Sequence, residues 1–523
     1  MIIQRTQNAA RNVAFGVLYK LYVTIIPFFM RTAMIYFMGV QYLGLDGIFL
    51  SVISVLNLAE LGVGSAMVYS MYKPIAEDDK STICALMNLY RRYYRIIGLV
   101  IAVAGICLFP FIPRLVKDDL PPEINIYLLY TLHLSATVLS YWLFAYKNSL
   151  LNAHQRRDLI SKVTIATSTV KYILQLLVMI FVKNYYLFVV ILLATQIMQN
   201  LLCAVVSNTY YPMYKAQGSL TCEKISDINK RIRDLFTAKV STAVVHSSDS
   251  VIVSAFLGLT VLAVYQNYFY IITALTGMVE IIFQASMAGI GNSIVVESKA
   301  KNYTDFKKLT LIIAWLAGFC TCCLLCLFQP FMRIWMNGNE TLMLGMGEVI
   351  CLCVYFFVSE INRITNTYKD AAGLWHETKF VPLANAIVNL TLNLILVRFW
   401  GLYGVLLSTV IGFVVVEIPL LLRNLFRTIF DKDGLWPHVR NLIYYTVVTV
   451  LACALTYAAC LPIHLSDILT LLVCGAICMI LPNIIFYAAY HKKPEFKQCL
   501  MMIDFITKGR LGKLISLVNN HKA

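Results

Sequence analysis

The chain has 523 residues, of which 59% are hydrophobic and only 13% are charged. A soluble domain carries about 25% charged residues, so this composition excludes a chain of ordinary soluble domains. Apolar runs of about twenty residues recur along the whole sequence, and a helix needs this length to cross the hydrocarbon core of a membrane. The net charge of +16 needs no nucleic-acid partner, because the membrane topology described below accounts for it.

The apolar runs predict an all-α membrane protein with about fourteen transmembrane helices. Barrel strands are excluded because the runs do not alternate every second residue. In chain order, the predicted spans are residues 13–38, 43–71, 96–116, 124–146, 160–182, 185–210, 236–258, 261–295, 309–334, 343–368, 380–399, 402–424, 440–461 and 467–490. The first span contains Lys20 and Arg31, which indicates a retained helix rather than a cleaved signal peptide.

Lysine and arginine predict the orientation. Fourteen spans divide the connecting segments into two alternating sets, one on each side of the membrane. The set that includes both termini holds 33 Lys and Arg residues, whereas the other set holds five. Positive residues mark the cytoplasmic side, so we expect both termini in the cytoplasm.

Polar residues recur at helical spacing inside several spans. In the first span Lys20, Thr24 and Arg31 share one face with Pro27. Later spans repeat the pattern in four polar stripes: Thr164, Thr167, Lys171 and Gln175; Lys239, His246, Ser250 and Ser254, with Asp249 at the edge; Gln266, Tyr270, Thr273, Glu280 and Gln284; and Glu348, Tyr355, Ser359, Asn362 and Asn366.

Two interpretations of these stripes stay open. Intramembrane charges usually face a bundle interior or a wet cavity, so the stripes could together wall a hydrated cavity. Polar and small residues also hold helices together without any cavity. Glu360 and Arg363 lie three residues apart and could simply pair with each other.

Motifs for cofactor chemistry are lacking in the sequence. Cys320, Cys322, Cys323 and Cys326 lie in an apolar helix, without the turn or the histidines of a zinc site, which favours small apolar fillers. No P-loop, HExxH or GxSxG motif occurs. We therefore expect no enzyme activity, no cofactor and no metal.

The two halves of the chain show a weak repeat. The segments 42–80 and 261–301 each run through a long helix with one glutamate, Glu60 or Glu280, and then reach a glycine pair where we expect a break. Duplicated lobes around a midplane site are typical of transporters. The predicted parts are an N-lobe, a C-lobe, two extra helices and a basic cytoplasmic tail: 1–225, 226–430, 431–490 and 491–523.

The stretch PFFMRTAMIYFMGVQYLGLDGIFLSVISVLNLAELGVGSAMVYSMYKPIAEDD, residues 27–79, resembles the amino-terminal signature of bacterial polysaccharide flippases. These are the Wzx-like members of the multidrug/oligosaccharidyl-lipid/polysaccharide exporter superfamily. The marks are Arg31 after Pro27, Tyr42-Leu43-Gly44-Leu45, Glu60-Leu61-Gly62 and Tyr72-Lys73-Pro74, and residues 362–379 are also similar.

This resemblance implies two six-helix lobes around a central cavity that works by alternating access in the bacterial inner membrane. The extra helices match the layout of related lipid II flippases, where they help to form a groove for the lipid tail. The implied substrate is a polyprenyl-pyrophosphate-linked oligosaccharide. Membrane lipids, other polysaccharide-assembly proteins and a coupling H⁺ or Na⁺ are further expected partners.

The residues fit that function in two groups. Cationic and amide side chains can hold phosphates and hydroxyls, and the candidates are Arg31, Lys20, Lys171, Lys239, Gln266 and Gln284. Carboxylates could couple transport to an ion or only neutralise nearby lysines, and these are Glu280, Asp249, Glu60 and Glu348. An Arg late in the first helix is functionally important in the relatives, and Arg31 occupies the similar position.

Three alternatives remain. A drug or organic-cation antiporter of the same superfamily would share the fold but favour an acidic cavity. A membrane-embedded glycan polymerase or ligase would need a large external loop with acid/base residues, and the outer loops here are short. A purely structural scaffold would not need five intramembrane cations.

Overall fold

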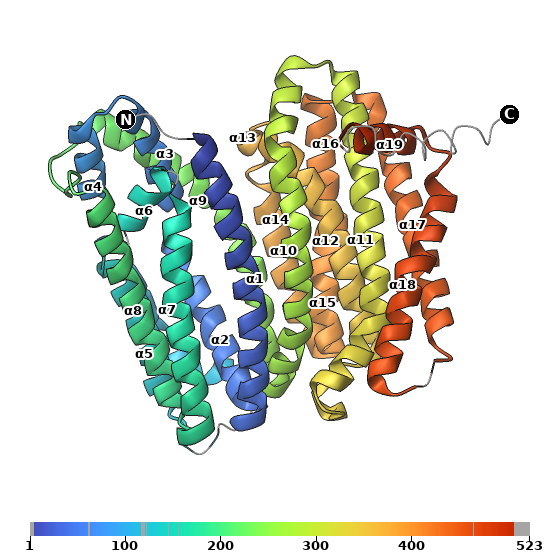
Figure 1. Ribbon diagram of the computed structural model, residues 1–523, viewed down its shortest axis with the longest axis horizontal. Helices are drawn as coiled ribbons and strands as arrows, with labels where there is room; N and C mark the ends of the chain where they lie inside the picture. The colour runs from blue at the N-terminus through green and yellow to red at the C-terminus, as the bar shows by residue number, and fades with distance from the viewer. Residues whose placement is uncertain are drawn as a thin grey trace. The chain divides into compact units, whose positions relative to one another are not determined.

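The computed structural model describes residues 5–60, 63–116, 121, 123–144, 146–154, 156–463 and 465–506. The side chains of some helical positions, including 5–18 and 237–246, lie outside the described part. Every regular element in the described residues is helical (Figure 1). The chain forms two compact units, Met1–Ala263 and Val264–Ala523.

The first unit contains helices α1 to α9 and the first turn of α10. Their bounds are α1 Arg5–Phe37, α2 Val40–Leu56, α3 Val63–Ala76, α4 Lys80–Leu108, α5 Ile126–Trp142, α6 Tyr146–Ala153, α7 Arg157–Leu177, α8 Tyr185–Tyr210, α9 Cys222–Leu257 and α10 Leu259–Val296. Short turns extend three of them: η1 Asn57–Glu60, η2 Phe109–Leu115 and the π-helical η3 Val178–Val182. Helix α7 packs between α1 and α8.

Local sequence explains where these helices begin and bend. Asp79 caps α4, because its carboxylate accepts hydrogen bonds from the Thr82 hydroxyl and amide and from Ser81. These bonds lower the pKa of Asp79 to about 2. Helices α5 and α6 form one bent run, with an angle of 53° between them. Gly44 lets α2 approach α10 closely, because a Cβ there would lie 2.4 Å from the Leu259 carbonyl oxygen.

The second unit contains the rest of α10 and helices α11 to α19. Their bounds are α11 Lys299–Trp335, η4 Glu340–Leu342, α12 Met346–Ala371, α13 Trp375–Thr378, α14 Val381–Trp400, α15 Leu402–Ile411, η5 Gly412–Glu417, α16 Ile418–Thr428, η6 Lys432–Gly434, α17 Leu435–Cys460, α18 Asp467–Tyr490 and α19 Pro494–Ile506. The η5 turn is π-helical and joins α15 to α16. One apolar core of this unit contains Phe306, Tyr368, Phe426 and Phe430.

Helices α17 and α18 dock on α11. Gly318 of α11 gives them room, because a Cβ there would lie 2.8 Å from the Phe486 ring and 2.9 Å from the Thr449 hydroxyl. The indole of Trp315 donates a hydrogen bond to Asn483 Oδ1 at 2.8 Å. The two added helices are therefore packed parts of the second unit.

The described residues contain ten helices long and apolar enough to cross a membrane, or eleven if the bent α5–α6 run counts as one span. Predicted spans 13–38, 43–71 and 236–258 fall on α1, on the broken α2–α3 run and on α9. The all-α membrane fold is confirmed, whereas the count of fourteen spans is not established.

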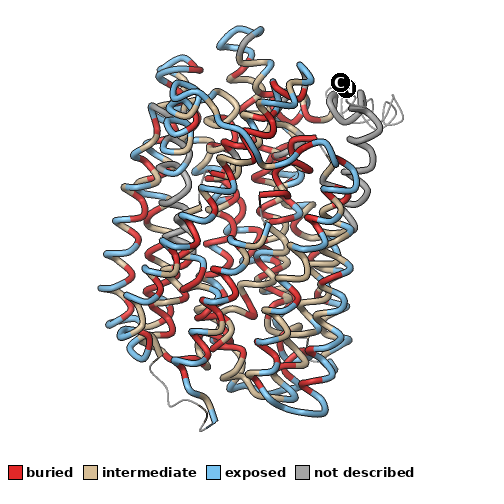
Figure 2. Tube along the Cα trace, turned by 90° about the vertical axis from the view of Figure 1, so that its left-hand side faces the viewer, coloured by how far each residue is buried: buried red, intermediate tan, exposed pale blue. Residues whose placement is uncertain are grey.

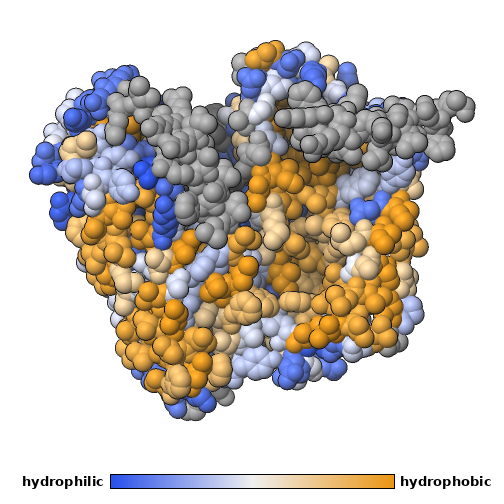
Figure 3. Space-filling model, in the orientation of Figure 1, coloured by the Kyte–Doolittle hydropathy of each residue, from blue (hydrophilic) through white to orange (hydrophobic). Residues whose placement is uncertain are grey.

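Burial follows the pattern of a membrane bundle. Buried positions lie on the faces where helices pack, and many outward positions are exposed (Figure 2). Large apolar side chains such as Phe181 and Phe399 are more than three-quarters exposed, as expected for side chains that face lipid. The space-filling view shows apolar residues along the helices and polar residues nearer their ends (Figure 3).

One expected break is wrong. Gly64 does lie beside an interruption, because α2 ends at Leu56 and α3 begins at Val63, whereas Gly62 lies outside the described residues. In the second half of the weak repeat, α10 continues through Gly289 and Gly291 to Val296. Helical hydrogen bonds continue there because a glycine lowers helix propensity by only about 1 kcal/mol, which packing can override.

Candidate functional site

A polar cavity of about 850 Å³ lies within the first unit. It is lined by Glu60, Gly64, Val68, Tyr69, Tyr72, Tyr90, Tyr94, Ser140, Tyr141, Asn148, Ser149, Asn152, Thr167, Ser168, Lys171, Leu192, Thr195, Gln196, Gln199 and Asn200. Most of these side chains are amides, hydroxyls or phenols, and the charged members are Glu60 and Lys171. The volume falls in the range of about 300–1,000 Å³ that is common for ligand pockets.

Glu60 is presented to the cavity by the break between α2 and α3. Its carboxylate accepts hydrogen bonds from Tyr94 Oη at 2.7 Å and from Tyr141 Oη at 3.3 Å. Tyr90 Oη lies 2.8 Å from Tyr94 Oη and extends this network. Gly64 leaves room for the neighbouring phenol, since a Cβ there would lie 3.1 Å from Tyr90 Oη. Phenols hold Glu60 in place.

Lys171 marks another part of the cavity wall, on α7. Its ammonium lies 4.1 Å from the centre of the Tyr172 ring. The α7 stripe predicted from the sequence faces α8 and the cavity. Gln199 donates to Thr164 Oγ1 at 3.1 Å, and Gln175 donates to the Phe188 carbonyl oxygen at 3.2 Å. The stripe therefore both joins helices and lines the cavity.

Lys171 also interacts electrostatically with a carboxylate of α2 that is in range of a second cation, on α1. Asp46 of α2 is within electrostatic range of Arg31 on α1 and of Lys171 on α7. A hydrogen bond of 2.9 Å between the Tyr22 and Thr169 hydroxyls also connects α1 to α7. The two cations and one carboxylate carry a formal charge of +1 together. We call Arg31, Asp46 and Lys171 the charge cluster.

Asp46 is not among the site residues predicted from the sequence. It is the only charged residue in the apolar run 40–56, and such an intramembrane charge is a signal of function. The residue was overlooked because no residue of α2 itself forms a polar stripe with it. Its partners come from α1 and α7, which the sequence alone does not place beside it.

The other predicted site residues are spread over both units. Lys20 is exposed on α1, and Asp249 is half-buried on α9. The side chains of Lys239 and Gln284 lie outside the described residues. Gln266 is half-buried on α10, and Glu348 hydrogen-bonds with Tyr403 in the second unit.

Glu280 lies within electrostatic range of Glu360 in the second unit. The expected pair of Glu360 and Arg363 is confirmed, with an Oε2–Nε distance of 3.4 Å. These contacts place Glu280 close to a structural ion pair.

The second unit also buries a carboxylate that was not predicted from the sequence. Glu417, on the π-helical turn η5, is only 8% exposed. Asn362 and Asn366 of α12 each donate to Oε1 at 3.0 Å, and Asn385 of α14 donates to Oε2 at 2.5 Å. This amide cluster joins α12, α14 and η5. Glu417 does not stand out in the sequence because no polar stripe at helical spacing includes it.

These residues suit reversible binding of a polar molecule. The first unit offers many neutral donors and acceptors, and it adds cationic and anionic groups at separate points of one wall. Among the described residues, the cavity lining holds no cysteine or histidine that could act as a nucleophile or metal ligand.

Comparisons of the whole chain identify its fold. The structure of lipid II flippase MurJ in an inward closed conformation matches with a TM-score of 0.69 and 14% identity, covering 91% of this chain and 99% of that chain. An inward-facing multidrug resistance MATE family transporter of the MOP superfamily matches with a TM-score of 0.59 and 15% identity, covering 78% and 97%.

A mutant form of the Vibrio cholerae MATE transporter VcmN matches with a TM-score of 0.56 and 13% identity, covering 81% of this chain and 98% of that chain. No protein-family model and no curated protein matches the sequence. The chain is a multi-pass membrane protein with the fold of MOP-superfamily transporters. This fold confirms the structural part of the resemblance noted in the sequence.

Proposed function

We propose that the protein moves a polyprenyl-pyrophosphate-linked oligosaccharide, a repeat unit of a surface polysaccharide, across the bacterial inner membrane by alternating access. The observation that carries this proposal is the polar cavity beside the charge cluster. Unaided transfer would leave sugar hydroxyls and phosphates without partners in hydrocarbon, at roughly 2–7 kcal/mol for each neutral polar group. The polar wall replaces those lost hydrogen bonds.

The parts of the substrate match different parts of the first unit. Amides such as Gln196, Gln199 and Asn200 can exchange hydrogen bonds with sugar hydroxyls, because an amide is both donor and acceptor. Arg31 and Lys171 can attract the pyrophosphate, with Asp46 offsetting one of their two positive charges. The polyprenyl tail would remain in lipid throughout.

An organic-cation antiporter is the second candidate, because one feature of the cavity favours it. Glu60 lies among Tyr90, Tyr94 and Tyr141, and a carboxylate with aromatic rings suits a bulky cation. The two functions require side chains of opposite charge in the cavity. A phosphate-bearing substrate depends on Lys171, whereas a cation depends on Glu60.

The test uses the purified protein in liposomes with a fluorescent polyprenyl-diphosphate saccharide. Movement is measured as the fraction of labelled lipid that a membrane-impermeant reagent can reach. We expect Lys171→Gln to reduce the rate at least tenfold and Glu60→Gln to have a smaller effect. If the labelled saccharide lipid does not move but the protein exchanges an organic cation in a way that requires Glu60, the antiporter replaces the proposed function.

A further inference from the structure

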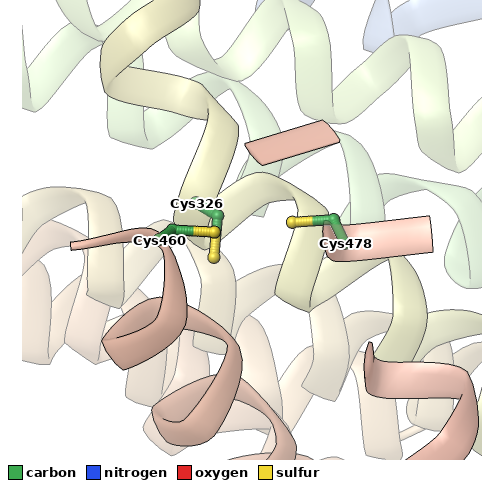
Figure 4. Close-up of side chains that lie close together, drawn as sticks. All are labelled: Cys326, Cys460 and Cys478. Atoms are coloured by element: carbon green, nitrogen blue, oxygen red, sulfur yellow. The ribbon is translucent and has the colours of Figure 1, made fainter. Parts of the chain in front are cut away.

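Three cysteine thiols from three helices converge inside the second unit. Cys326 of α11, Cys460 of α17 and Cys478 of α18 have Sγ atoms that all lie within 4.8 Å of one another (Figure 4). Their exposed fractions are 5%, 7% and 0%. The group therefore meets the distance requirement for ligands of one ion in a closed site. We call these residues the thiol cluster.

Helical spacing explains why the thiols meet. Cys322 and Cys326 lie one turn apart on α11, and Cys474 and Cys478 lie one turn apart on α18. Cys460 comes from the packed face of α17. The faces on which these three helices dock are thus lined with sulfur. In the sequence only the cysteines of α11 form a visible group, because their partners on α17 and α18 are more than a hundred residues away along the chain.

The donor set decides which ion fits. The group supplies three sulfur atoms, and the side chains packed around them are Leu327, Tyr457, Ile463, Ile477 and two further cysteines, Cys323 and Cys474. Soft thiolate ligands select Cu(I) or Zn(II) among common metal ions. Structural Zn(II) almost always takes four ligands, whereas three soft donors satisfy Cu(I). A monovalent ion also needs fewer ionised thiols in an apolar interior than a divalent one.

We propose that the thiol cluster binds one Cu(I) ion and thereby fastens α17 and α18 to α11. The copper stays in the +1 state, and the thiols that become thiolates release their protons to solvent, so no oxidant is needed. The site lies in the second unit and does not depend on the function proposed for the cavity of the first unit. It would act as a structural clamp on the last two membrane helices.

A neighbouring pair of thiols supplies a matched control. Cys322 and Cys453 have Sγ atoms 3.4 Å apart, and both are buried between α11 and α17. Replacing this pair removes two buried sulfur atoms from the same helix contact but leaves the thiol cluster intact. Copper bound by cysteines in general would be lost from this pair variant and also from a variant of the thiol cluster. Copper bound by the thiol cluster would be lost only from the cluster variant.

The experiment uses the full chain purified without oxygen in detergent, stripped of metal, and titrated with Cu(I) against bicinchoninate as a competing chelator. We expect the wild type to retain about one copper per chain, with three sulfur neighbours by X-ray absorption and a raised thermal midpoint. Cys478→Ser should weaken retention at least tenfold and abolish the thermal shift. Cys322→Ser/Cys453→Ser should keep both.

The wild-type absorption spectrum keeps the proposal testable even if Cys478→Ser fails to fold. A wild-type protein that loses all copper to the chelator would overturn the site. So would equal retention by every variant, or nitrogen and oxygen neighbours around the bound copper. Retention of Zn(II) but not Cu(I) by the same three cysteines would overturn the choice of ion.

Discussion

At the scale of single residues, Asp46 gives Arg31 a second possible role besides contact with phosphate. On sequence grounds alone, a buried carboxylate such as Glu60 or Glu280 could equally pair with Arg31. The structure instead brings Asp46 within electrostatic range of Arg31, while Tyr94 and Tyr141 bind Glu60. Arg31 therefore either contacts phosphate or serves mainly to neutralise Asp46, and variants of these two residues separate the roles.

We predict that Arg31→Ala reduces lipid-linked oligosaccharide movement at least a hundredfold at normal abundance in the membrane. Arg31→Lys should restore only part of the rate, because an ammonium cannot form the two parallel hydrogen bonds that a guanidinium makes to phosphate. The double variant Arg31→Ala/Asp46→Asn should stay inactive. The measurement is the liposome assay, with membrane abundance determined on a gel.

Lys20→Ala is the matched control for this prediction. Lys20 is exposed on the same helix, eleven residues or about 16 Å from Arg31, so one pyrophosphate cannot bridge both. Its loss should be milder. Recovery of transport in the double variant would mean that Arg31 only neutralises Asp46, and the phosphate role would then fail.

A second residue-scale prediction concerns ion coupling. If a proton or sodium gradient drives transport, Glu280→Gln should weaken the dependence on that gradient, and Asp249→Asn is the next candidate. Glu280 lies in electrostatic range of Glu360, which pairs with Arg363. A change in the charge of Glu280 therefore changes the electrostatic environment of that ion pair. Transport rates are measured with and without each gradient. Unchanged gradient dependence in both variants would leave these carboxylates as structural residues.

At the scale of elements, small residues determine how closely the last helices approach α11. Any Cβ at position 318 would press against both α17 and α18, through Thr449 and the rigid ring of Phe486. Gly475 of α18 is a contrasting case, because a Cβ there would have no heavy atom of the described residues within 4 Å. The two glycines lie in the same docked group of helices but have different surroundings.

Gly318→Ala is predicted to lower the free energy of unfolding by about 1–3 kcal/mol, the usual effect of overpacking. Gly475→Ala should be neutral or raise it by up to about 1 kcal/mol, because alanine favours the helix and its Cβ meets no neighbour in the described part of the chain. Unfolding in a mixed-micelle denaturant titration gives both values. Equal stability of the two variants would show that α17 and α18 can shift away from α11 without penalty.

At the scale of the whole molecule, the distribution of positive residues predicts one orientation. A cysteine at Lys215 should be cytoplasmic, and one at Glu340 should be external; both positions are exposed. In a chain that lacks the exposed Cys107 and Cys222, an impermeant maleimide added to intact cells should label position 340 alone. Position 215 should react only after the cells are opened. The reverse pattern would overturn the orientation.

The sequence allowed much of the architecture to be predicted, because apolar run length and helical period are local properties. It correctly predicted the all-α membrane fold, the polar stripe of α7 and the pair of Glu360 and Arg363. It did not reveal Asp46 or Glu417, whose partners lie on other helices. Such contacts depend on which faces pack together, and that information is not local.

The π-helical turn before α16 changes the direction, around the helix axis, in which the side chains after it point relative to those before it. Ser408 and Glu417 are nine residues apart, which would place them about 180° apart on an uninterrupted α-helix. Both nevertheless bond to α14, through Asn393 and Asn385 respectively. The wider turn accommodates one additional residue and so removes about 100° of rotation. Deleting a single residue such as Val414 would restore the ordinary pitch, and Ser408 and Glu417 could then no longer face the α14 asparagines together.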